Sequence, residues 1–218
     1  MLEIVYAIPS CNIDRCRRTF ELWKRQGYKT AVLMNGGIKA PENADLVVEV
    51  EKYGGYYQSF NTLYTKLPDA DVIITGGDDI HPDMKYKAQE LGEQFFQRFP
   101  DGFGVMQPIG DNMKGNETIC ASPWIGKGWL KRAYKGKFPF WPEYIGFYGD
   151  QELKEIVEQL KILWLRKDVK QYHNHWSRPG GPPKTEYQAN NDRHWDADKA
   201  LFYKRKAAGW PEYEPLPA

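Results

Sequence analysis

The stretch DADVIITGGDDIHPD, residues 69–83, decides the fold that this sequence predicts. An apolar run of strand type, VII at 72–74, leads into two glycines, and the carboxylates Asp78 and Asp79 follow at once. A strand that ends this way delivers oxygen ligands to the edge of a sheet, where open α/β sheets bind their ligands. Such ligands suit Mg²⁺ or Mn²⁺, which reach proteins through one or two carboxylates plus substrate phosphates. A polar turn that caps the next helix is the alternative interpretation, because Asp and Gly are ordinary turn residues.

Strand-like and helix-like segments alternate on both sides of this stretch. Apolar runs predict strands at 2–8, 29–34, 45–50, 103–107 and 162–165. Apolar residues spaced three and four apart predict helices at 13–26, 57–67 and 151–160. Pro82 predicts the start of another helix, with Met84, Ala88, Leu91 and Phe95 on its buried face. The alternation predicts an α/β fold with a mostly parallel central sheet flanked by helices on both faces.

The character of the sequence changes after Trp176. Six of the 15 prolines lie beyond that point, together with Trp195 and Trp210. We therefore predict one α/β domain over residues 1–176 and a C-terminal arm over 177–218 that wraps it. Residues 123–148, rich in Pro, Gly and aromatic side chains, predict loop plus a short helix.

Bulk composition excludes several classes of protein. Thirty Lys and Arg balance 29 Asp and Glu, so no global field attracts a polyanion. Three cysteines, an odd count, argue against a disulfide framework. The N-terminus is too short and too acidic for a secretion signal, and no apolar run reaches the length of a membrane span. We expect a soluble, cytoplasmic protein.

Four blocks, taken in order, resemble the GT-A fold of nucleotide-sugar-dependent glycosyltransferases. They are YAIPSCN (6–12), GGYYQSFNTLYTKL (54–67), ITGGDDIHP (74–82) and FYGDQELKEIVEQL (147–160). The resemblance implies that Ala7, Pro9 and Ser10 frame the nucleoside of a nucleotide-sugar donor. It also implies that Tyr53, Ser59 and Asn61 line the donor pocket.

The resemblance also implies a metal site and its ligands. Asp79 aligns with the metal-binding aspartate of the family, whereas Gly77 stands where the family has a first acidic residue. Asp78 is then expected to contact the ribose, or the metal through water. The family often adds a late histidine, for which His173 and His175 are the candidates. Both can instead be histidines that make ordinary hydrogen bonds. The expected cofactor is Mn²⁺ or Mg²⁺.

The last block implies a general base. Asp150 is the first candidate and Glu152 the second, and a base at this position implies inversion at the anomeric carbon. The alternative for Asp150 is a helix N-cap directly after Gly149. UDP is the default nucleotide because most of the family uses it.

The acceptor is left open between two classes. Residues 124–141, WIGKGWLKRAYKGKFPFW, combine five basic residues with six aromatic ones and no acid. Basic residues track phosphates and aromatic faces stack on bases, so a hydroxylated (hydroxymethyl) DNA base is one acceptor. Aromatic faces also stack on sugars, so a glycan is the other. Alternatively, the aromatics fill the core and the lysines form a solvated surface.

Other functions explain the sequence less well. A nucleotidyltransferase is the nearest enzymatic alternative, but no Gly-rich, basic phosphate loop occurs. A non-catalytic nucleotide- or carbohydrate-binding module would not need Asp79 together with Asp150. The tripeptide HNH at 173–175 is not the nuclease motif of that name, which is not contiguous.

Overall fold

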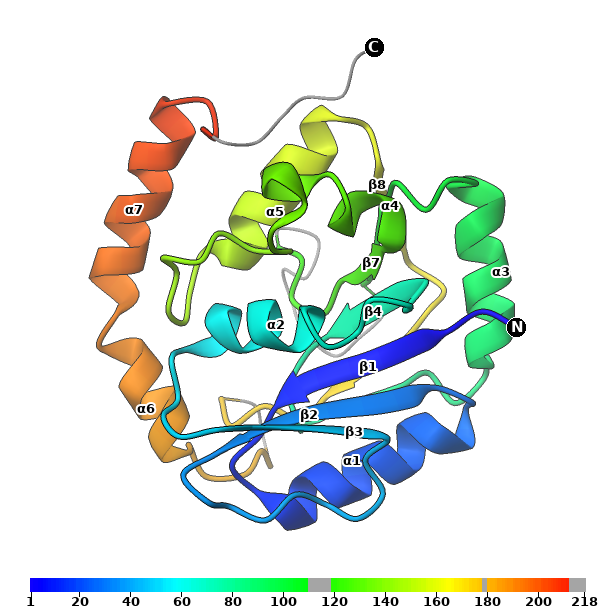
Figure 1. Ribbon diagram of the computed structural model, residues 1–218, viewed down its shortest axis with the longest axis vertical. Helices are drawn as coiled ribbons and strands as arrows, with labels where there is room; N and C mark the ends of the chain where they lie inside the picture. The colour runs from blue at the N-terminus through cyan, green and yellow to red at the C-terminus, as the bar shows by residue number, and fades with distance from the viewer. Residues whose placement is uncertain (110–118, 178–179, 212–218) are drawn as a thin grey trace.

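The computed structural model describes residues 1–109, 119–177 and 180–211. Within these residues a seven-stranded sheet has the order β3-β2-β1-β4-β7-β6-β8 (Figure 1). Its strands are β1 (Ile4–Pro9), β2 (Lys29–Asn35), β3 (Leu46–Val50), β4 (Val72–Thr75), β6 (Val105–Pro108), β7 (Trp124–Gly126) and β8 (Leu163–Arg166). A separate two-stranded sheet joins β5 (Ile80–His81) to β9 (Tyr172–His173). This is the α/β fold with a mostly parallel sheet that the sequence predicts.

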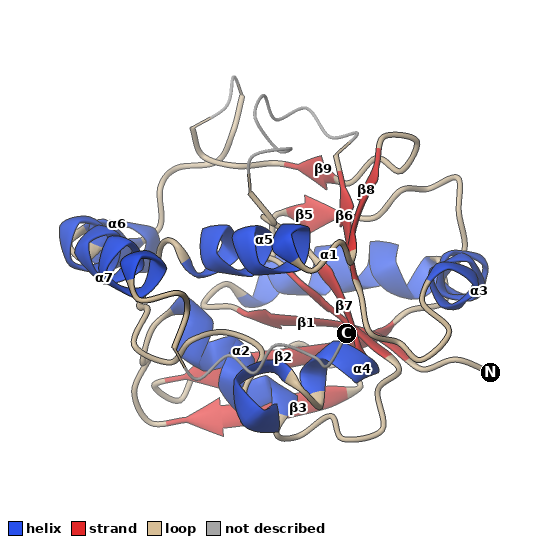
Figure 2. Cartoon of the chain, turned by 90° about the horizontal axis from the view of Figure 1, so that it is seen from above, coloured by secondary structure: helices blue, strands red, loops and turns tan. Residues whose placement is uncertain are grey.

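Helices cover both faces of the sheet. Helices α1 (Ile13–Arg25) and α3 (Ala88–Arg98) pack on one face. Helices α2 (Tyr56–Tyr64), α4 (Lys127–Leu130) and α5 (Gly149–Gln159) pack on the other, together with the short helix η2 (Ala133–Gly136). Helices α6 (Glu186–Asp192) and α7 (Trp195–Ala207) run one after the other along one side of the molecule (Figures 1 and 2).

Strand β1 shows why the core has two halves. Successive side chains of a strand point to opposite faces of the sheet. Val5 and Ala7 therefore join the apolar cluster under α2 and α5, while Tyr6 and Ile8 join the cluster under α1 and α3. Because both faces are covered, the strand is apolar throughout, as expected for a buried parallel strand.

The directions of the strands determine which edge of the sheet carries the predicted site residues. Strands β3, β2, β1 and β4 are parallel neighbours. Strand β7 is antiparallel to both β4 and β6, so β6 and its parallel partner β8 run in the direction of β4. The carboxyl ends of β1 and β4 therefore lie at one edge, where Pro9 and the segment that carries Asp78 and Asp79 emerge.

The helix predicted to start at Pro82 starts instead at Ala88. The intervening residues are occupied by other contacts: Asp83 accepts hydrogen bonds from the backbone N–H groups of Lys85 (2.9 Å) and Lys170 (2.7 Å). These contacts connect the segment after β5 with the segment before β9. Met84, predicted to be buried, is 54% exposed.

Two features of the second half also differ from the prediction. Residues 124–126 form strand β7 in the middle of the sheet, although the sequence there predicts loop. Helix α5 begins at Gly149 with Tyr148 as its N-cap, so the prediction of Asp150 as N-cap is wrong. Asp150 lies in the first turn instead. The helices α6 and α7 are also absent from the sequence prediction.

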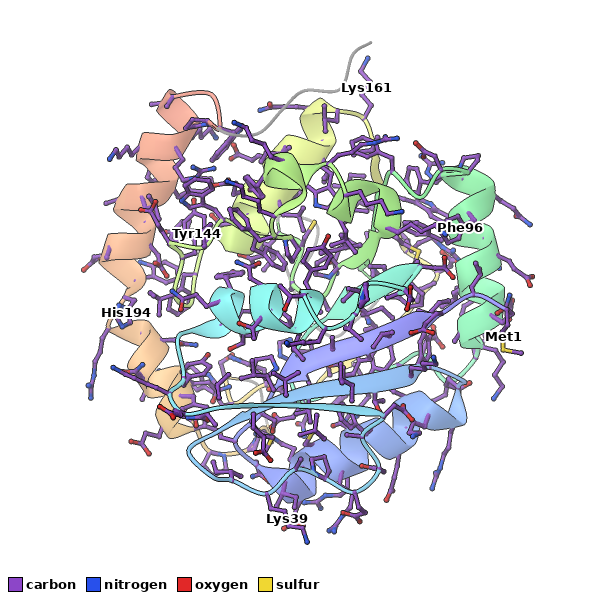
Figure 3. All side chains as sticks on the ribbon, in the orientation of Figure 1. Met1, Lys39, Phe96, Tyr144, Lys161 and His194 are labelled. Atoms are coloured by element: carbon purple, nitrogen blue, oxygen red, sulfur yellow. The ribbon has the colours of Figure 1, made fainter. Side chains whose placement is uncertain are left out.

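Helix α7 is attached to the domain through a buried ionic network. Arg205 donates two hydrogen bonds to the carboxylate of Glu152 (2.8 and 2.7 Å), and Tyr134 and Tyr144 each donate one (2.6 and 2.7 Å). Glu152 is fully buried, and the Arg205 guanidinium lies over the ring of Trp141 (3.6 Å to the centroid). Figure 3 marks Tyr144 on the side of the core next to α7. Segments 178–179 and 212–218 of the predicted arm lie outside the described residues.

No helix among the described residues is long and apolar enough to cross a membrane. Cys11, Cys16 and Cys120 are free thiols, in keeping with the absence of a disulfide framework expected from their number.

Arg205→Met should strongly destabilise the fold because it leaves the Glu152 carboxylate buried and unpaired. We expect a loss of roughly 3–5 kcal/mol in the free energy of unfolding, measured in urea. Lys206→Ala is the matched control, since it removes the exposed Lys206–Glu155 pair of the same helix and should cost less than about 1 kcal/mol. Equal losses in the two variants would contradict this account of how α7 is held.

Candidate functional site

A cleft with a volume of about 250 Å³ lies at the carboxyl edge of β1 and β4. Four segments supply most of its lining: the loop after β1, the segment after β4, the segment after β9 and helix α6. Four of the sequence-predicted site residues of the first two segments line it directly, namely Pro9, Ser10, Asp78 and Asp79. The structure thus brings together residues that are about seventy positions apart in the chain.

Asp78 connects the two N-terminal segments of the cleft. Ser10 Oγ donates to Asp78 Oδ2 (2.6 Å), and Arg15 Nη2 pairs with Oδ1 (2.6 Å). Thr19 Oγ1 donates to the backbone carbonyl of Asp78 (2.6 Å). Burial raises the pKa of the Asp78 carboxyl, although Arg15 and Ser10 act against that shift. The carboxylate is therefore fixed in place by the start of α1 and the loop after β1.

Asp79 faces the segment that follows β9. Its Oδ1 lies 3.5 Å from Nε2 of His173, and its backbone carbonyl accepts from Asn174 N (2.8 Å). The pairing of β5 with β9 places these residues side by side, because Ile80 lies opposite His173. Burial would raise the pKa of the Asp79 carboxyl, but hydrogen bonding to His173 and its charge hold that pKa below the usual value.

Asp79 and His173 are suited to hold a metal ion, judged by their donor atoms. A carboxylate oxygen and an imidazole nitrogen are both ligands that Mn²⁺ accepts. His175 also lines the cleft, with its ring centroid 5.0 Å from that of His173, and its Nδ1 lies 2.8 Å from Ser177 Oγ. No group of three or more such side chains is arranged around one point in the described parts of the chain. An ion here would take its remaining ligands from substrate phosphates and water, as Mg²⁺ usually does.

Asp150 lies beside the cleft and not on its lining. Tyr57 OH donates to Asp150 Oδ1 (2.9 Å), and the same oxygen accepts from Gln151 N (3.0 Å). Tyr56, the neighbour of Tyr57, lines the cleft. Among the described residues Oδ2 has no hydrogen-bond partner, so one oxygen is available to accept a proton. Burial raises the pKa of Asp150, whereas the hydrogen bond from Tyr57 lowers it.

Four other residues suggested by the resemblance do not line this cleft. Glu152 is held in the buried network with Arg205, and Ala7 is a fully buried residue of β1 that faces the core under α2 and α5. Ser59 Oγ donates to Gly55 O (2.7 Å) within α2, so its hydroxyl serves the helix. Asn61 bonds the backbone of Phe140 through both its amide atoms. Ser59 and Asn61, which were predicted to line the donor pocket, therefore do not line this cleft.

Tyr53 does line the cleft, and a partner missed in the sequence lies against it. The rings of Tyr53 and Tyr187 stack with centroids 4.6 Å apart, and Tyr187 OH donates to Asn35 Oδ1 at the end of β2. Tyr187 belongs to α6, as does Asn191. The Oδ1 atom of Asn191 is buried and has no hydrogen-bond partner among the described residues. Only the capping box of Thr185 and Gln188 could have predicted this helix.

Arg15 is the second residue that sequence reasoning missed. It lies in the first turn of α1 and lines the cleft, and its Nε is buried with no hydrogen-bond partner in the described part of the chain. The helix start after the Asn12 cap could have indicated it, because the first turn of a helix at a sheet edge is a common anion site.

In the basic aromatic segment 124–141, four of the six aromatic side chains lie in the core and four of the five basic side chains are exposed, which matches the alternative arrangement given above. Trp124, Trp129, Tyr134 and Phe140 are each at most 2% exposed. The first residue of α4, Lys127, pairs with Asp71 (2.5 Å) before the start of β4, at the edge of the sheet opposite the cleft. These four buried aromatic faces are not available to stack on an acceptor, and the segment gives no support for a DNA acceptor.

The sequence matches no family model and no curated protein. Solved structures do resemble the fold. GalNAc-T7 with UDP, GalNAc and Mn²⁺ gives a TM-score of 0.60 at 12% identity, over 100% of this chain and 52% of that one. S. aureus TarS gives 0.55 at 11% identity, over 79% and 60%.

A third similar structure is the Drosophila β-1,4-galactosyltransferase 7 with manganese, UDP-Gal and xylobiose. Its TM-score is 0.50 at 12% identity, over 87% of this chain and 79% of that one. This chain thus spans about half of GalNAc-T7 but most of the galactosyltransferase. At such identities the likeness establishes the fold alone. The chain has the GT-A fold of nucleotide-sugar-dependent glycosyltransferases.

Proposed function

We propose that this protein is a metal-dependent glycosyltransferase that moves a sugar from a nucleotide-sugar, UDP-sugar by default, to an acceptor hydroxyl. The observation that carries the proposal is the cleft at the carboxyl edge of β1 and β4, where Asp79 meets His173 and Asp78 meets Arg15. Ligands of open α/β sheets bind at this edge. Similar structures contain UDP or UDP-Gal together with manganese in their own sites.

The charges of the cleft favour a diphosphate that arrives with a divalent cation. Asp78 and Asp79 contribute two negative charges, and Arg15 contributes one positive charge. A sugar diphosphate adds about two more negative charges, which a half-buried cleft does not accept without compensation. Asp79 and His173 would hold a divalent ion, which would neutralise charge on the departing diphosphate. Arg15, which is paired with Asp78, adds a fixed positive charge to the cleft.

The remaining residues have roles that follow from their positions. The Tyr53–Tyr187 stack, next to Pro9 and Ser10, provides an apolar surface for the nucleoside. Asp150 Oδ2 takes the proton of the acceptor hydroxyl, while Oδ1 stays bonded to Tyr57. A positioned general base contributes about 10²- to 10⁴-fold to such a step. Attack assisted by a base on the face opposite the leaving diphosphate inverts the anomeric carbon. A glycan is the acceptor class that we favour, because a similar structure holds xylobiose together with UDP-Gal.

The function is tested by melting the protein with a panel of nucleotide-sugars, each with and without Mn²⁺, and then assaying transfer or hydrolysis of the best ligand. A true donor should raise Tm more with Mn²⁺ than without it, because binding to the folded state stabilises it by mass action. Binding with no turnover of any donor would instead identify a non-catalytic nucleotide-binding module.

Asp79→Asn should remove the effect of Mn²⁺ on donor melting and lower turnover at least ~100-fold, about 2.7 kcal/mol of transition-state stabilisation. Asp69→Asn is the control, because Asp69 is an exposed carboxylate at the opposite end of β4. Undiminished Mn²⁺-stimulated turnover in the Asp79 variant would remove the metal from the proposal.

Arg15→Gln should weaken UDP binding at least ~10-fold, since hydrogen bonds to charged groups contribute about 1.5–3 kcal/mol. Uridine, which carries no phosphate, should bind within about threefold of its wild-type affinity. Calorimetry measures both. Arg18→Gln on the exposed face of the same helix serves as control. An equal loss for UDP and uridine would show that Arg15 supports the shape of the cleft and not the phosphates.

Tyr57→Phe should move the acid limb of the pH profile of kcat/KM to higher pH. Asp150 acts only when ionised, so rate is lost as pH falls through its pKa. The Tyr57 hydrogen bond lowers that pKa, so removing it raises the pKa further above the usual value for Asp. The variant should therefore be slower at low pH and approach its full rate at high pH. Tyr64→Phe, whose hydroxyl bonds Leu130 O, should leave the limb unmoved; a limb unchanged in both variants would exclude Asp150 as the base.

A further inference from the structure

The turn at residues 145–148 connects the cleft to the candidate base. Gly146 and Phe147 line the cleft, and Asp150 follows three residues after Phe147. A Cβ added at Gly146 would lie 2.7 Å from Cβ of Asn191 on α6, so this turn is pressed against the C-terminal segment. Any movement of the turn would change the wall of the cleft and the start of α5 together.

A single carboxylate on α7 holds this turn. Asp198 Oδ2 accepts from Gly146 N and Phe147 N, both at 2.9 Å, and Asp198 Oδ1 accepts from Ile145 N at 3.2 Å. Asp198 is 2% exposed, and no basic side chain is paired with it among the described residues. Three backbone N–H groups thus replace the counter-ion that a buried carboxylate normally requires.

The backbone at the end of this turn is strained, and α7 holds it as well. Tyr148 has φ of 67°, in the left-handed region that bulky residues rarely adopt. The ring of Trp195 contacts those of Phe147 and Tyr148 (centroids 4.7 and 5.2 Å), and Phe202 contacts Tyr148 (5.3 Å). Such strain costs of order 1–3 kcal/mol and persists only where surrounding contacts impose it.

We propose that Asp198 is a positioning residue for the reaction, a role that rests on the proposed function. Asp198 and Trp195 of α7 fix the turn 145–148, and through it they set one wall of the cleft and the direction in which Asp150 enters α5. Asp198 touches no reacting atom in this account. Its loss leaves the nucleoside end of the cleft, around Tyr53 and Ser10, in place.

The test compares Asp198→Asn with wild type in three measurements. The amide keeps the size of the side chain but loses the negative charge, and its NH2 group replaces one of the two acceptor oxygens that face backbone N–H donors, so the turn is held more weakly. We expect hydrogen exchange in peptides covering 144–148 to become at least ~10-fold faster. We expect kcat to fall at least ~10-fold, while Kd for UDP changes less than about threefold.

Two control variants distinguish the positioning role of Asp198 from a general loss of stability and from the loss of a negative charge at the start of α7. Asp196→Asn removes an exposed carboxylate from the same first turn of α7, so it matches the loss of helix-terminus charge without touching the turn. Leu91→Ala removes buried apolar atoms from the core on the opposite face of the sheet. It serves as a destabilised variant in which the turn 145–148 is intact. Both should keep exchange at 144–148 and kcat near wild type at a temperature where they are folded.

A second variant keeps the proposal testable if Asp198→Asn does not fold. Trp195→Leu removes a ring that is 43% exposed, so the fold should survive, and it should change exchange and kcat in the same direction by a smaller factor. Unchanged kcat in Asp198→Asn, or a fall matched by Leu91→Ala, would overturn the inference. Wild-type protein without turnover of any nucleotide-sugar would overturn the proposed function itself, whereas an active wild type with an unaffected Asp198 variant removes only the inference.

Discussion

The site depends on one buried carboxylate and its neutralisation. Asp78 joins the loop after β1 through Ser10, the first turn of α1 through Arg15, and the body of α1 through Thr19. An unpaired carboxylate at this depth would be strongly destabilising, so the three elements are held together wherever the carboxylate stays charged. The adjacent Asp79 is thereby presented to His173 from a fixed backbone. The two aspartates therefore differ in role. Asp78 is structural and holds the segments at the edge of the sheet together, whereas Asp79 faces the proposed ligand.

Much of the fold can be predicted from the sequence because its signals are local. Strands β1, β2 and β4 each contain an uninterrupted apolar run, and α1 combines a cap at Asn12 with regularly spaced apolar residues, so their type and order follow from the pattern. Strand β7 could not be predicted, because three residues, Trp124 to Gly126, hold their place only through neighbours that are distant in the chain. The start of α3 was misplaced for a similar reason: a proline can begin a helix, but the contacts of Asp83 take precedence here.

The residues of the candidate site differ in the same way in how far the sequence could predict them. Pro9, Ser10, Asp78 and Asp79 follow strands, so their convergence at one edge is a consequence of strand direction. Ser59 and Asn61 do not line the cleft, because the resemblance implies a helix here but does not indicate which face of that helix points toward the cleft. Arg15, Tyr187 and Asn191 were missed because each depends on how helices pack at the edge, which no short motif encodes. His173 became a candidate because the family resemblance implies a late histidine, and its contact with Asp79 arises from the pairing of β5 with β9.

The contribution of α6 and α7 to the cleft has a consequence for how the molecule is made and handled. Tyr187 and Asp198 belong to the last forty residues, so a nascent chain leaves the ribosome with its sheet strands complete before the pocket can close. A chain that ends between β9 and α6 would keep every strand of the sheet and lack the wall that α6 supplies. Met1, by contrast, lies beside α3, well away from His194 at the junction of α6 and α7 (Figure 3). A fusion partner or immobilisation tag therefore belongs at the N-terminus, where it leaves the pocket undisturbed.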